Sequence, residues 1–544
     1  MEKKVKSQTF VKGIIVLFFS QIIIKLLGFI YRVVITGMQG FGDMGNSYYG
    51  AAFQFYTAIL AVSTVGVPAA VAKLVAEKVA VKDYKGAHKI FKTALVLFSI
   101  IGLVGTGIMY FGAGLMAGII KNPGVELSLK SLSMSIFFVA LASIIRGYFQ
   151  GYCDMRPQAN SQILDQLAKC FFTIWLTWLF IGNSPEVMAA AATFGATIGT
   201  FFSFIYLFIY YKRRQKAIKA DVEATEVNSN EGRKYISLKL ISLAIPIMLG
   251  AIITSIAGLV NLFTVIPRLL VAGKTQEEAQ ILYGMITGKS DTILNLPLAL
   301  NVVYATSLVP NISRAFALKD YKDAAKKINF SIFSTVLITL PAAVGISILS
   351  DPIVKMIFPT APLGGFYIRV SAYAVVFIAL AQTLGGALQG MGKVAVPAIS
   401  LLSGAILKYI LNYILVAQNT INIFSIEIEM NVMGAAYSTI ACYLLTFLIS
   451  FNVLKKQIEL NFDYIKCFVK PAIASTVMGI CTYFSYEVGF NWLASNTKAT
   501  LLSICVGVAT YGITVLLVGA FSKDELEHLP LVGSIFSKIF SRGK

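Results

Sequence analysis

Long apolar stretches separated by short polar segments run through almost the whole sequence. A helix that crosses a lipid bilayer needs about 20 mainly apolar residues, and about 14 stretches of the chain reach that length. They are Phe10–Ile35, Ser47–Leu74, Phe91–Ile120, Leu127–Gln150, Ala159–Ile181, Met188–Tyr211, Leu240–Phe263, Leu282–Ile312, Phe330–Leu349, Gly365–Gly390, Val394–Val416, Val432–Leu454, Cys467–Val488 and Ala499–Phe521. The sequence therefore predicts an all-α polytopic membrane protein.

The composition excludes several classes of protein. Of 544 residues, 57% are hydrophobic and 13% are charged, whereas a soluble domain has about a quarter charged residues. No room remains for a large catalytic domain, and the short outer loops carry no histidine, so we expect no enzyme. The two histidines lie outside the apolar stretches and the six cysteines show no CxxC spacing, which predicts neither a metal site nor another cofactor. Gly284–Ser290 resembles a P-loop but has one residue too few between its glycines, so we expect no ATP site.

The net charge of +20 is first explained by the positive-inside rule, and not by nucleic-acid binding. With the N-terminus inside and 14 alternating spans, the inner segments carry about 33 Lys and Arg and the outer loops about seven. We therefore expect a multi-pass protein of the bacterial cytoplasmic membrane with both termini in the cytoplasm. The first stretch contains Lys25 and Arg32 and no cleavage site follows it, so a retained helix is expected, not a signal peptide.

An internal repeat divides the chain. Lys82–Lys89 returns as Lys319–Lys326, 237 positions later. Two further pairs share an offset of 239, namely Phe138–Ala142 with Phe377–Ala381 and Gly147–Gly151 with Gly386–Gly390. Six spans separate the copies, so both copies have the same orientation and are related by an axis along the membrane normal.

This repeat predicts the domain organisation of a transporter with two pseudo-symmetric halves. We expect an N-terminal six-helix half over residues 1–212, a cytoplasmic linker over 213–239, and a C-terminal six-helix half over 240–456. Residues 457–544 are expected to hold two extra helices and an amphipathic tail.

Basic residues inside the predicted spans are the candidate functional residues. They are Lys25, Arg32, Arg146, Lys169, Arg369 and Lys408, with Lys289 near the outer end of a span. Each Lys or Arg at the centre of a membrane helix costs roughly 2.5–3.5 kcal/mol on insertion scales. The repeat makes Lys169 and Lys408 symmetry mates. Such a set predicts a wet, cationic central cavity.

Alternative interpretations exist for some of these charges. Arg32 and Arg369 lie near the outer surface, where long basic side chains can extend to the membrane interface. Asp165 lies four residues before Lys169 on the same helix face, so this pair can neutralise itself. Asp165 and Asp291 are the candidate charge partners of the cations.

A cationic cavity favours an anion, because Arg and Lys form charge-assisted hydrogen bonds with phosphate oxygens. Inside a membrane, the natural carriers of such a group are a phospholipid or a sugar linked to a polyprenyl pyrophosphate. A small soluble anion is a further alternative. Since no ATP site is expected, the driving force must come from an ion gradient, the membrane potential or consumption of the product.

The segments Leu27–Arg32 and Ser63–Pro68, together with the 14 spans and the repeat, resemble the multidrug/oligosaccharidyl-lipid/polysaccharide (MOP) exporter superfamily. Within it, the chain is most similar to the polysaccharide-biosynthesis branch of Gram-positive bacteria, which includes stage V sporulation protein B and the MurJ-type lipid II flippases. The resemblance implies outward movement of an undecaprenyl-pyrophosphate-linked peptidoglycan precursor by alternating access. It also implies that helices 13 and 14 form a groove for the lipid tail.

The resemblance can also be followed residue by residue. Lys25 stands where an arginine is expected in the MurJ type, and Arg32 matches a second arginine with a shift of one residue. Some relatives bind sodium through acids of spans seven and eleven, but Asn261, Lys408 and Asn412 offer no carboxylate there, so no sodium site is predicted.

The expected partners are an anionic lipid-linked oligosaccharide, membrane lipids and the cell-wall synthesis machinery. The alternatives are a flippase for another polyprenyl-linked polysaccharide unit and an ion-coupled multidrug antiporter of the same superfamily. An antiporter for cations is expected to expose several membrane carboxylates, and this chain has few.

Overall fold

The computed structural model describes residues 10–61, 66–223, 225, 231–423, 426–458 and 463–520. Most of them lie in helices, which confirms the all-α class. Two short antiparallel strands, β1 (Thr420–Ile423) and β2 (Ile426–Glu429), form a hairpin. The amphipathic tail predicted beyond residue 520 and part of the Ser63–Pro68 motif lie outside the described residues.

The chain divides into two compact units. Unit 1 comprises Met1–Ala299, Phe358–Gly364 and Leu401–Cys442, and unit 2 comprises Leu300–Ile357, Gly365–Ser400 and Tyr443–Lys544. Three helices have residues in both units: α11 (Asp291–Ala317), α16 (Ala395–Leu415) and α17 (Val432–Gln457).

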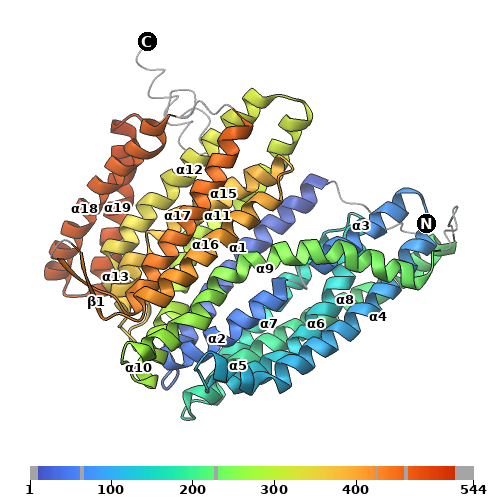
Figure 1. Ribbon diagram of the computed structural model, residues 1–544, viewed down its shortest axis with the longest axis horizontal. Helices are drawn as coiled ribbons and strands as arrows, with labels where there is room; N and C mark the ends of the chain where they lie inside the picture. The colour runs from blue at the N-terminus through green and yellow to red at the C-terminus, as the bar shows by residue number, and fades with distance from the viewer. Residues whose placement is uncertain are drawn as a thin grey trace. The chain divides into compact units, whose positions relative to one another are not determined.

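Unit 1 is built from the helices of the first half of the chain. They are α1 (Phe10–Thr36), α2 (Gly42–Ala61), α3 (Val67–Ala80), α4 (Tyr84–Phe111), α5 (Ala113–Ile119), α6 (Val125–Gly151), α7 (Arg156–Leu179), α8 (Pro185–Glu223), α9 (Arg233–Val271), α10 (Gln276–Gly284) and the π-helical segment η2 (Met285–Ser290). In this unit α6, α7 and α8 lie side by side (Figure 1).

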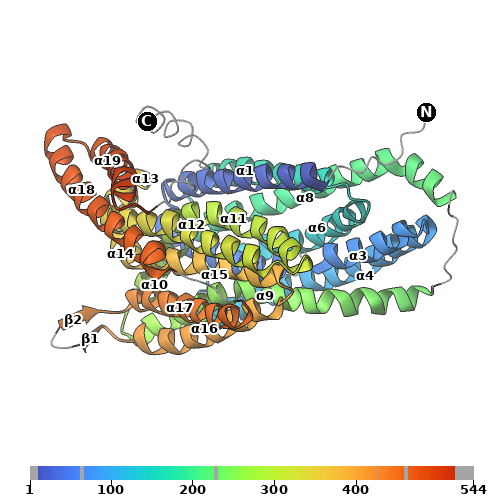
Figure 2. The same ribbon diagram turned by 90° about the horizontal axis from the view of Figure 1, so that it is seen from above.

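Unit 2 contains the remaining helices. They are α12 (Tyr321–Ile348), α13 (Ser350–Ile357), α14 (Gly365–Ser371), α15 (Ala374–Gly390), the π-helical segment η3 (Ile465–Val469), α18 (Lys470–Leu493) and α19 (Asn496–Leu517). The last two helices pack along each other, and α18 also contacts α12 (Figure 2). Helices α18 and α19 both lie within residues 457–544, where two extra helices are expected from the sequence.

Within the part of the chain that the structure describes, nine helices are long and apolar enough to cross a membrane, or ten if the bent pair α14 and α15 forms one span. Helices α2 and α7 are not among them. Both carry polar side chains, Gln54 on α2 and Lys169 on α7 for example, that face the interior of unit 1. The length and composition of these helices support a multi-pass membrane protein. They do not by themselves confirm the predicted number of 14 spans.

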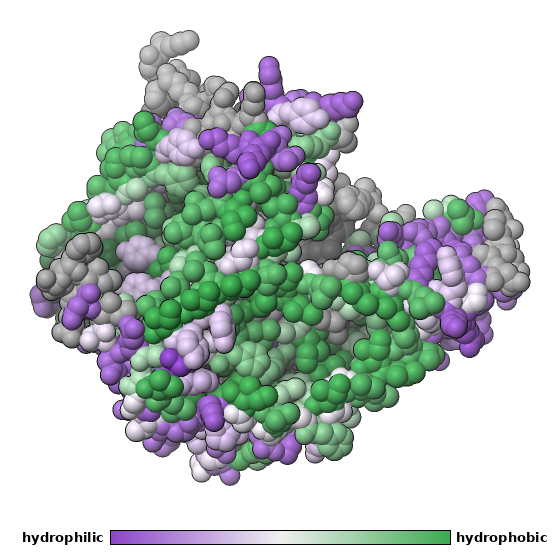
Figure 3. Space-filling model, in the orientation of Figure 1, coloured by the Kyte–Doolittle hydropathy of each residue, from purple (hydrophilic) through white to green (hydrophobic). Residues whose placement is uncertain are grey.

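Apolar side chains cover the outside of unit 1 along its helices. On α4, Val96, Ile100, Val104 and Ile108 are exposed. Figure 3 shows a hydrophobic face over α4 and α9, with hydrophilic residues gathered where α8 ends and α9 begins. Such a face suits contact with lipid acyl chains.

The predicted linker is shorter in the structure. Helix α8 continues to Glu223 and α9 begins at Arg233, so both helices extend into residues 213–239. Lys, Arg, Gln and Ala dominate the end of α8, and these are strong helix formers. The helix therefore continues beyond its apolar part, where a hydropathy pattern cannot detect it.

The two copies of the repeat form the same local structures. Asp83 caps α4 by accepting a hydrogen bond from the Gly86 amide at 2.7 Å, and Asp320 caps α12 in the same way through Asp323 at 3.0 Å. The lysine before each cap has a φ of 57°. The matching sequences thus encode the same helix start in each copy.

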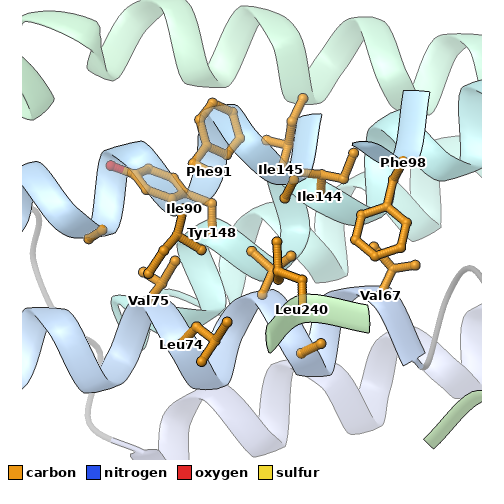
Figure 4. Packing of buried hydrophobic residues seen from close by; sticks show 14 of the residues in the cluster. Val67, Leu74, Val75, Ile90, Phe91, Phe98, Ile144, Ile145, Tyr148 and Leu240 are labelled. Carbon is orange, nitrogen blue, oxygen red and sulfur yellow. The ribbon is translucent and has the colours of Figure 1, made fainter. Parts of the chain in front are cut away.

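A hydrophobic core holds α3, α4, α6 and the start of α9 together in unit 1 (Figure 4). Phe91 and Tyr148 both belong to it, with ring centroids 4.6 Å apart. A Cβ atom at Gly147 would lie 2.8 Å from the backbone oxygen of Pro68. Glycine at this position therefore allows α6 to approach α3 closely.

Candidate binding cavity

Two neighbouring cavities lie inside unit 1. The cationic cavity has a volume of about 340 Å³ and is bordered by α1, α2, α7, η2 and α11. Its charged and amide side chains are those of Lys25, Arg32, Gln54, Gln166, Lys169, Asp291 and Asn295. The side cavity has a volume of about 220 Å³, contains Arg146 and Asp165, and shares Ile24 and Gln166 with the cationic cavity.

Helix α1 contributes two cations to the cationic cavity. Lys25 and Arg32 are seven residues apart, which places them on one stripe of a helix, and both line the cavity. Gly28 lies between them, and a Cβ atom there would be 3.6 Å from Nε2 of Gln166. Because Gly28 has no side chain, nothing projects from α1 at this position between the two basic residues, where α7 packs against α1.

Arg32 is held at one edge of the cavity. Its Nη2 donates a hydrogen bond to the backbone oxygen of Thr287 at 2.5 Å, and its guanidinium carbon lies 4.6 Å from the ring centroid of Tyr49. Its Nη1 is buried and, among the residues that the structure describes, has no hydrogen-bond partner. One donor of the guanidinium is therefore available to a ligand.

Lys169 lies against an aromatic wall. Its Nζ is 3.9 Å from the ring centroid of Phe53 and 5.2 Å from that of Tyr31. Tyr49 stacks on Phe53 with the ring centroids 5.1 Å apart, and the Tyr31 and Tyr49 hydroxyls are 3.1 Å apart. Cation–π contacts stabilise the ammonium group without cancelling its charge.

The carboxylates near these cations are few. In the described part of the chain no ion pair joins Asp165 to Lys169, although Asp165 interacts electrostatically with both Lys169 and Arg146. Asp291 lines the cationic cavity and interacts electrostatically with Arg32 and Lys408. Three cations and one carboxylate therefore line the cationic cavity, which suits an anionic ligand.

Arg146 lies in the side cavity. It is buried, its Nε donates to Ser161 Oγ at 2.9 Å, and its Nη2 donates to Ser203 Oγ at 2.7 Å. These two bonds fix the guanidinium between α6, α7 and α8. Arg146 therefore borders a space that is connected to the cationic cavity through shared lining residues and is not part of the same cation cluster.

The structure places the remaining predicted residues outside the cationic cavity. Lys289 is fully buried and pairs with Asp43 Oδ2 at 2.7 Å, and its Nζ also donates to the Leu363 carbonyl at 2.7 Å. Lys408 is buried and donates to the Ala257 carbonyl at 2.9 Å. In unit 2, exposed Arg369 pairs with Asp351 at 2.6 Å.

The interactions of Lys289 and Lys408 differ from the sequence expectations. The partner of Lys289 is Asp43, which lies 246 positions away in the sequence, and neighbouring Asp291 faces the cavity instead. Lys408 occupies the repeat position of Lys169, yet it donates to the backbone of α9 and does not line the cavity. The two copies thus use their matched lysines differently.

Sequence reasoning missed the aromatic wall of Tyr31, Tyr49 and Phe53. Its residues are ordinary among apolar helix positions. They are distinguished only by their contacts with cations, Tyr31 and Phe53 with Lys169 and Tyr49 with Arg32. It also missed the amide groups of Gln54 and Gln166. Both lie inside predicted spans, and an uncharged polar residue at such a position could have indicated a polar cavity.

The segment that resembles a P-loop is part of a packed helix. Gly284–Ser290 covers the end of α10 and all of η2. A Cβ atom at Gly284 would overlap the backbone oxygen of Asp43, and one at Gly288 would overlap the side chain of Asn46. Both glycines are therefore explained by close packing against α2.

Apolar helices around polar cavities place the chain in the class of polytopic membrane proteins. A family model described as polysaccharide biosynthesis protein matches residues 10–316, more than half of the chain. The chain belongs to this family. The MatE family model matches residues 289–414.

The comparisons with known proteins agree with this assignment. The chain is 26% identical to the lipid II flippase MurJ of Bacillus subtilis (strain 168) over 557 residues, covering 99% of each protein. It is also 26% identical to stage V sporulation protein B of the same organism, over 97% of this chain and 99% of that protein.

Solved structures show the same fold. A lipid II flippase MurJ in the inward closed conformation matches with a TM-score of 0.69 at 17% identity, covering 94% of this chain and 99% of that chain. An inward-facing multidrug resistance MATE family transporter of the MOP superfamily matches with a TM-score of 0.65 at 16% identity, over 81% of this chain and 99% of that chain. The matches to the two family models, together with the two relatives above, confirm the predicted resemblance.

Proposed function

We propose that this protein is a flippase for a lipid-linked oligosaccharide. Its most specific candidate substrate is the undecaprenyl-pyrophosphate-linked peptidoglycan precursor lipid II, moved from the inner to the outer leaflet by alternating access. The observation that carries the proposal is the cationic cavity, where Lys25, Arg32 and Lys169 meet a single carboxylate, Asp291, among the lining residues that the structure describes. The relatives named as a lipid II flippase and a sporulation protein support it.

The cavity residues have distinct roles in this proposal. Lys25 and Lys169 supply positive charge to a diphosphate, and the free Nη1 of Arg32 donates a hydrogen bond to one of its oxygens. The aromatic wall excludes water behind Lys169 and strengthens this attraction. The prenyl tail stays in the lipid, and α18 and α19 are the proposed surface for it.

The proposed topology places both termini in the cytoplasm, in agreement with the distribution of Lys and Arg. The membrane potential is worth about 2.3 kcal/mol per elementary charge per 100 mV. A potential that is positive outside favours outward movement of an anionic headgroup. We therefore propose that the membrane potential contributes to the driving force.

A complementation experiment tests the function. Lipid II flippase activity is depleted in a bacterial host, this chain is expressed, and both growth and the exposure of lipid II at the outer surface are measured. We expect wild type to restore both, and the variant Lys25→Gln/Lys169→Gln to restore neither. The matched control is Lys130→Gln, a partly exposed lysine in a helical i,i+4 pair with Glu126 that lines neither cavity.

The outcomes separate the alternatives. Failure of well-expressed wild type to restore either readout argues against lipid II and favours another polyprenyl-linked unit. Rescue by Lys25→Gln/Lys169→Gln argues against the cationic cavity as the substrate site.

The MatE match supports one second candidate, an ion-coupled drug antiporter. Asp291 is the carboxylate that such a mechanism would use in this cavity. If the chain confers resistance to cationic drugs, and Asp291→Asn abolishes that resistance, the antiporter is favoured. Unchanged drug sensitivity together with lipid II rescue favours the flippase.

A further inference from the structure

The side cavity differs chemically from the cationic cavity beside it. It contains one cation, Arg146, and one carboxylate, Asp165, so its fixed charges balance. Its other polar lining residues carry amide or hydroxyl groups, namely Gln162, Gln166, Thr200 and Ser203. A balanced set of donors and acceptors is suited to a neutral, hydroxyl-rich ligand and not to an anion.

Asp165 is the most informative residue of this cavity. In the region that the structure describes, its carboxylate has Arg146 and Lys169 as electrostatic neighbours but no hydrogen bond or ion pair. On α8 the adjacent residue is Gly199, where a Cβ atom would lie 2.9 Å from Oδ1 of Asp165. The carboxylate lines the side cavity and accepts no hydrogen bond from the described residues, so it has free capacity for hydroxyl donors.

Arg146 makes the site rigid. Its bonds to Ser161 and Ser203 join α6 to α7 and α8, and they use two of its three nitrogen atoms. A fixed guanidinium beside a free carboxylate gives a donor and an acceptor at defined positions. Held in this way, polar groups lose little conformational freedom when a ligand binds.

The two cavities are neighbours on the same helices. Ile24 of α1 and Gln166 of α7 line both of them. Lys169 faces the cationic cavity and Asp165, one helical turn away, faces the side cavity. A ligand with an anionic part joined to a hydroxyl-rich part would match this arrangement.

We propose that the side cavity is a saccharide subsite, in which Asp165, Arg146 and Thr200 hold the first sugar while the cationic cavity holds the diphosphate. This inference rests on the proposed function and assigns to it the position of the sugar. Asp165 accepts hydrogen bonds from sugar hydroxyls, and Gln166 lies at the junction between the sugar and the diphosphate.

The test uses the full chain in lipid nanodiscs and two probes, undecaprenyl diphosphate with and without an attached disaccharide. Binding is measured by microscale thermophoresis. We expect wild type to bind the disaccharide-bearing probe roughly tenfold more tightly, the effect of two or three hydrogen bonds. Asp165→Asn and the nearly isosteric Thr200→Val are each expected to lower this preference below threefold.

Two controls make the result specific. Lys169→Gln is expected to weaken binding of both probes by the same factor. Leu167→Ala, on the exposed side of α7, is expected to change neither. Thermal unfolding of each variant in the nanodisc checks that the fold is intact.

The possible failures are distinguishable. If wild type binds both probes equally, or if Asp165→Asn and Thr200→Val both keep the full preference, the saccharide subsite is overturned while the proposed function stands. If wild type binds neither probe, the proposed function fails and the subsite fails with it.

Discussion

At the scale of single residues, the basic side chains fall into two groups. Those that already have a partner within the protein are structural, and those that line the cavity without an ion pair are candidates for ligand binding. Lys289 and Arg369 pair with carboxylates, and Lys408 donates to a backbone carbonyl. Lys25 and Lys169 line the cationic cavity, and no ion pair is found for either in the described part of the chain. A cation inside a membrane protein is thus better judged by what it contacts than by its depth in a span.

Arg32 is expected to be intolerant of a conservative change. Its guanidinium contacts the Thr287 carbonyl and the Tyr49 ring at once, and a lysine cannot reproduce this planar arrangement. Arg32→Lys is expected to weaken binding of undecaprenyl diphosphate about tenfold, the loss of one charge-assisted hydrogen bond. Arg369→Lys is the matched control and should bind like wild type, since Arg369 is exposed. Equal binding by Arg32→Lys and wild type would contradict this role.

The buried pair of Lys289 and Asp43 gives a prediction about stability. Lys289→Met leaves the Asp43 carboxylate without its ammonium partner, so we expect a loss of roughly 3–5 kcal/mol. The double variant Asp43→Asn/Lys289→Met is expected to recover at least half of that loss. Thermal unfolding in detergent measures both. Additive destabilisation in the double variant would show that the pair is not coupled.

The sequence was informative for residues within one helix and poor for contacts between distant helices. The spacing of Lys25 and Arg32 predicted a shared face, and both line one cavity. The pairing of Lys289 with Asp43 depends on how α2 packs against η2, and a single sequence carries no record of this contact. The repeat predicted equivalent positions for Lys408 and Lys169. It could not predict their contacts, because α16 and α7 pack against different helices.

At the scale of helices, η2 interrupts the regular hydrogen bonding of the α10–α11 segment beside the cationic cavity. Short π-helical segments of this kind often occur at functional sites. Here the segment contributes Thr287 to the cavity wall and buries Lys289. The π-helical segment η2 therefore forms part of the cavity wall and also packs against α2.

Packing of η2 on α2 can be tested through its glycines. The Cβ atom in Gly288→Ala would overlap the Asn46 side chain, and overpacking of this kind costs about 1–3 kcal/mol. We expect a lower unfolding temperature and weaker diphosphate binding, because Thr287 moves with η2. Gly107→Ala in α4 is the control, since a Cβ atom there meets nothing within 4 Å. The same unfolding temperature for both variants would argue against close packing at Gly288.

Hydropathy predicted the helices better than their ends. The span predicted over Ala159–Ile181 corresponds to α7, Arg156–Leu179. The span predicted over Ser47–Leu74 corresponds to two helices, α2 and α3. Residues 62–65 between these two helices lie outside the described part of the chain. Apolar patterns do not reveal the polar extension of α8.

At the scale of the whole molecule, the proposed topology predicts which loops face the cytoplasm. In a variant without native cysteines, Lys234→Cys is expected to react with a membrane-impermeant thiol reagent only after the cells are opened. Glu277→Cys is expected to react in intact cells. Both positions are exposed. The reverse pattern of labelling would invert the proposed orientation and, with it, the direction in which the membrane potential acts.

The two ends of the Arg32 guanidinium have different surroundings. One nitrogen is bonded to the backbone of η2, and another is buried without a partner among the described residues. In the proposed function, an anion bound at the second nitrogen would be linked to the π-helical turn through a single side chain. Arrival of the cargo would then add a restraint on η2, and its departure would remove it.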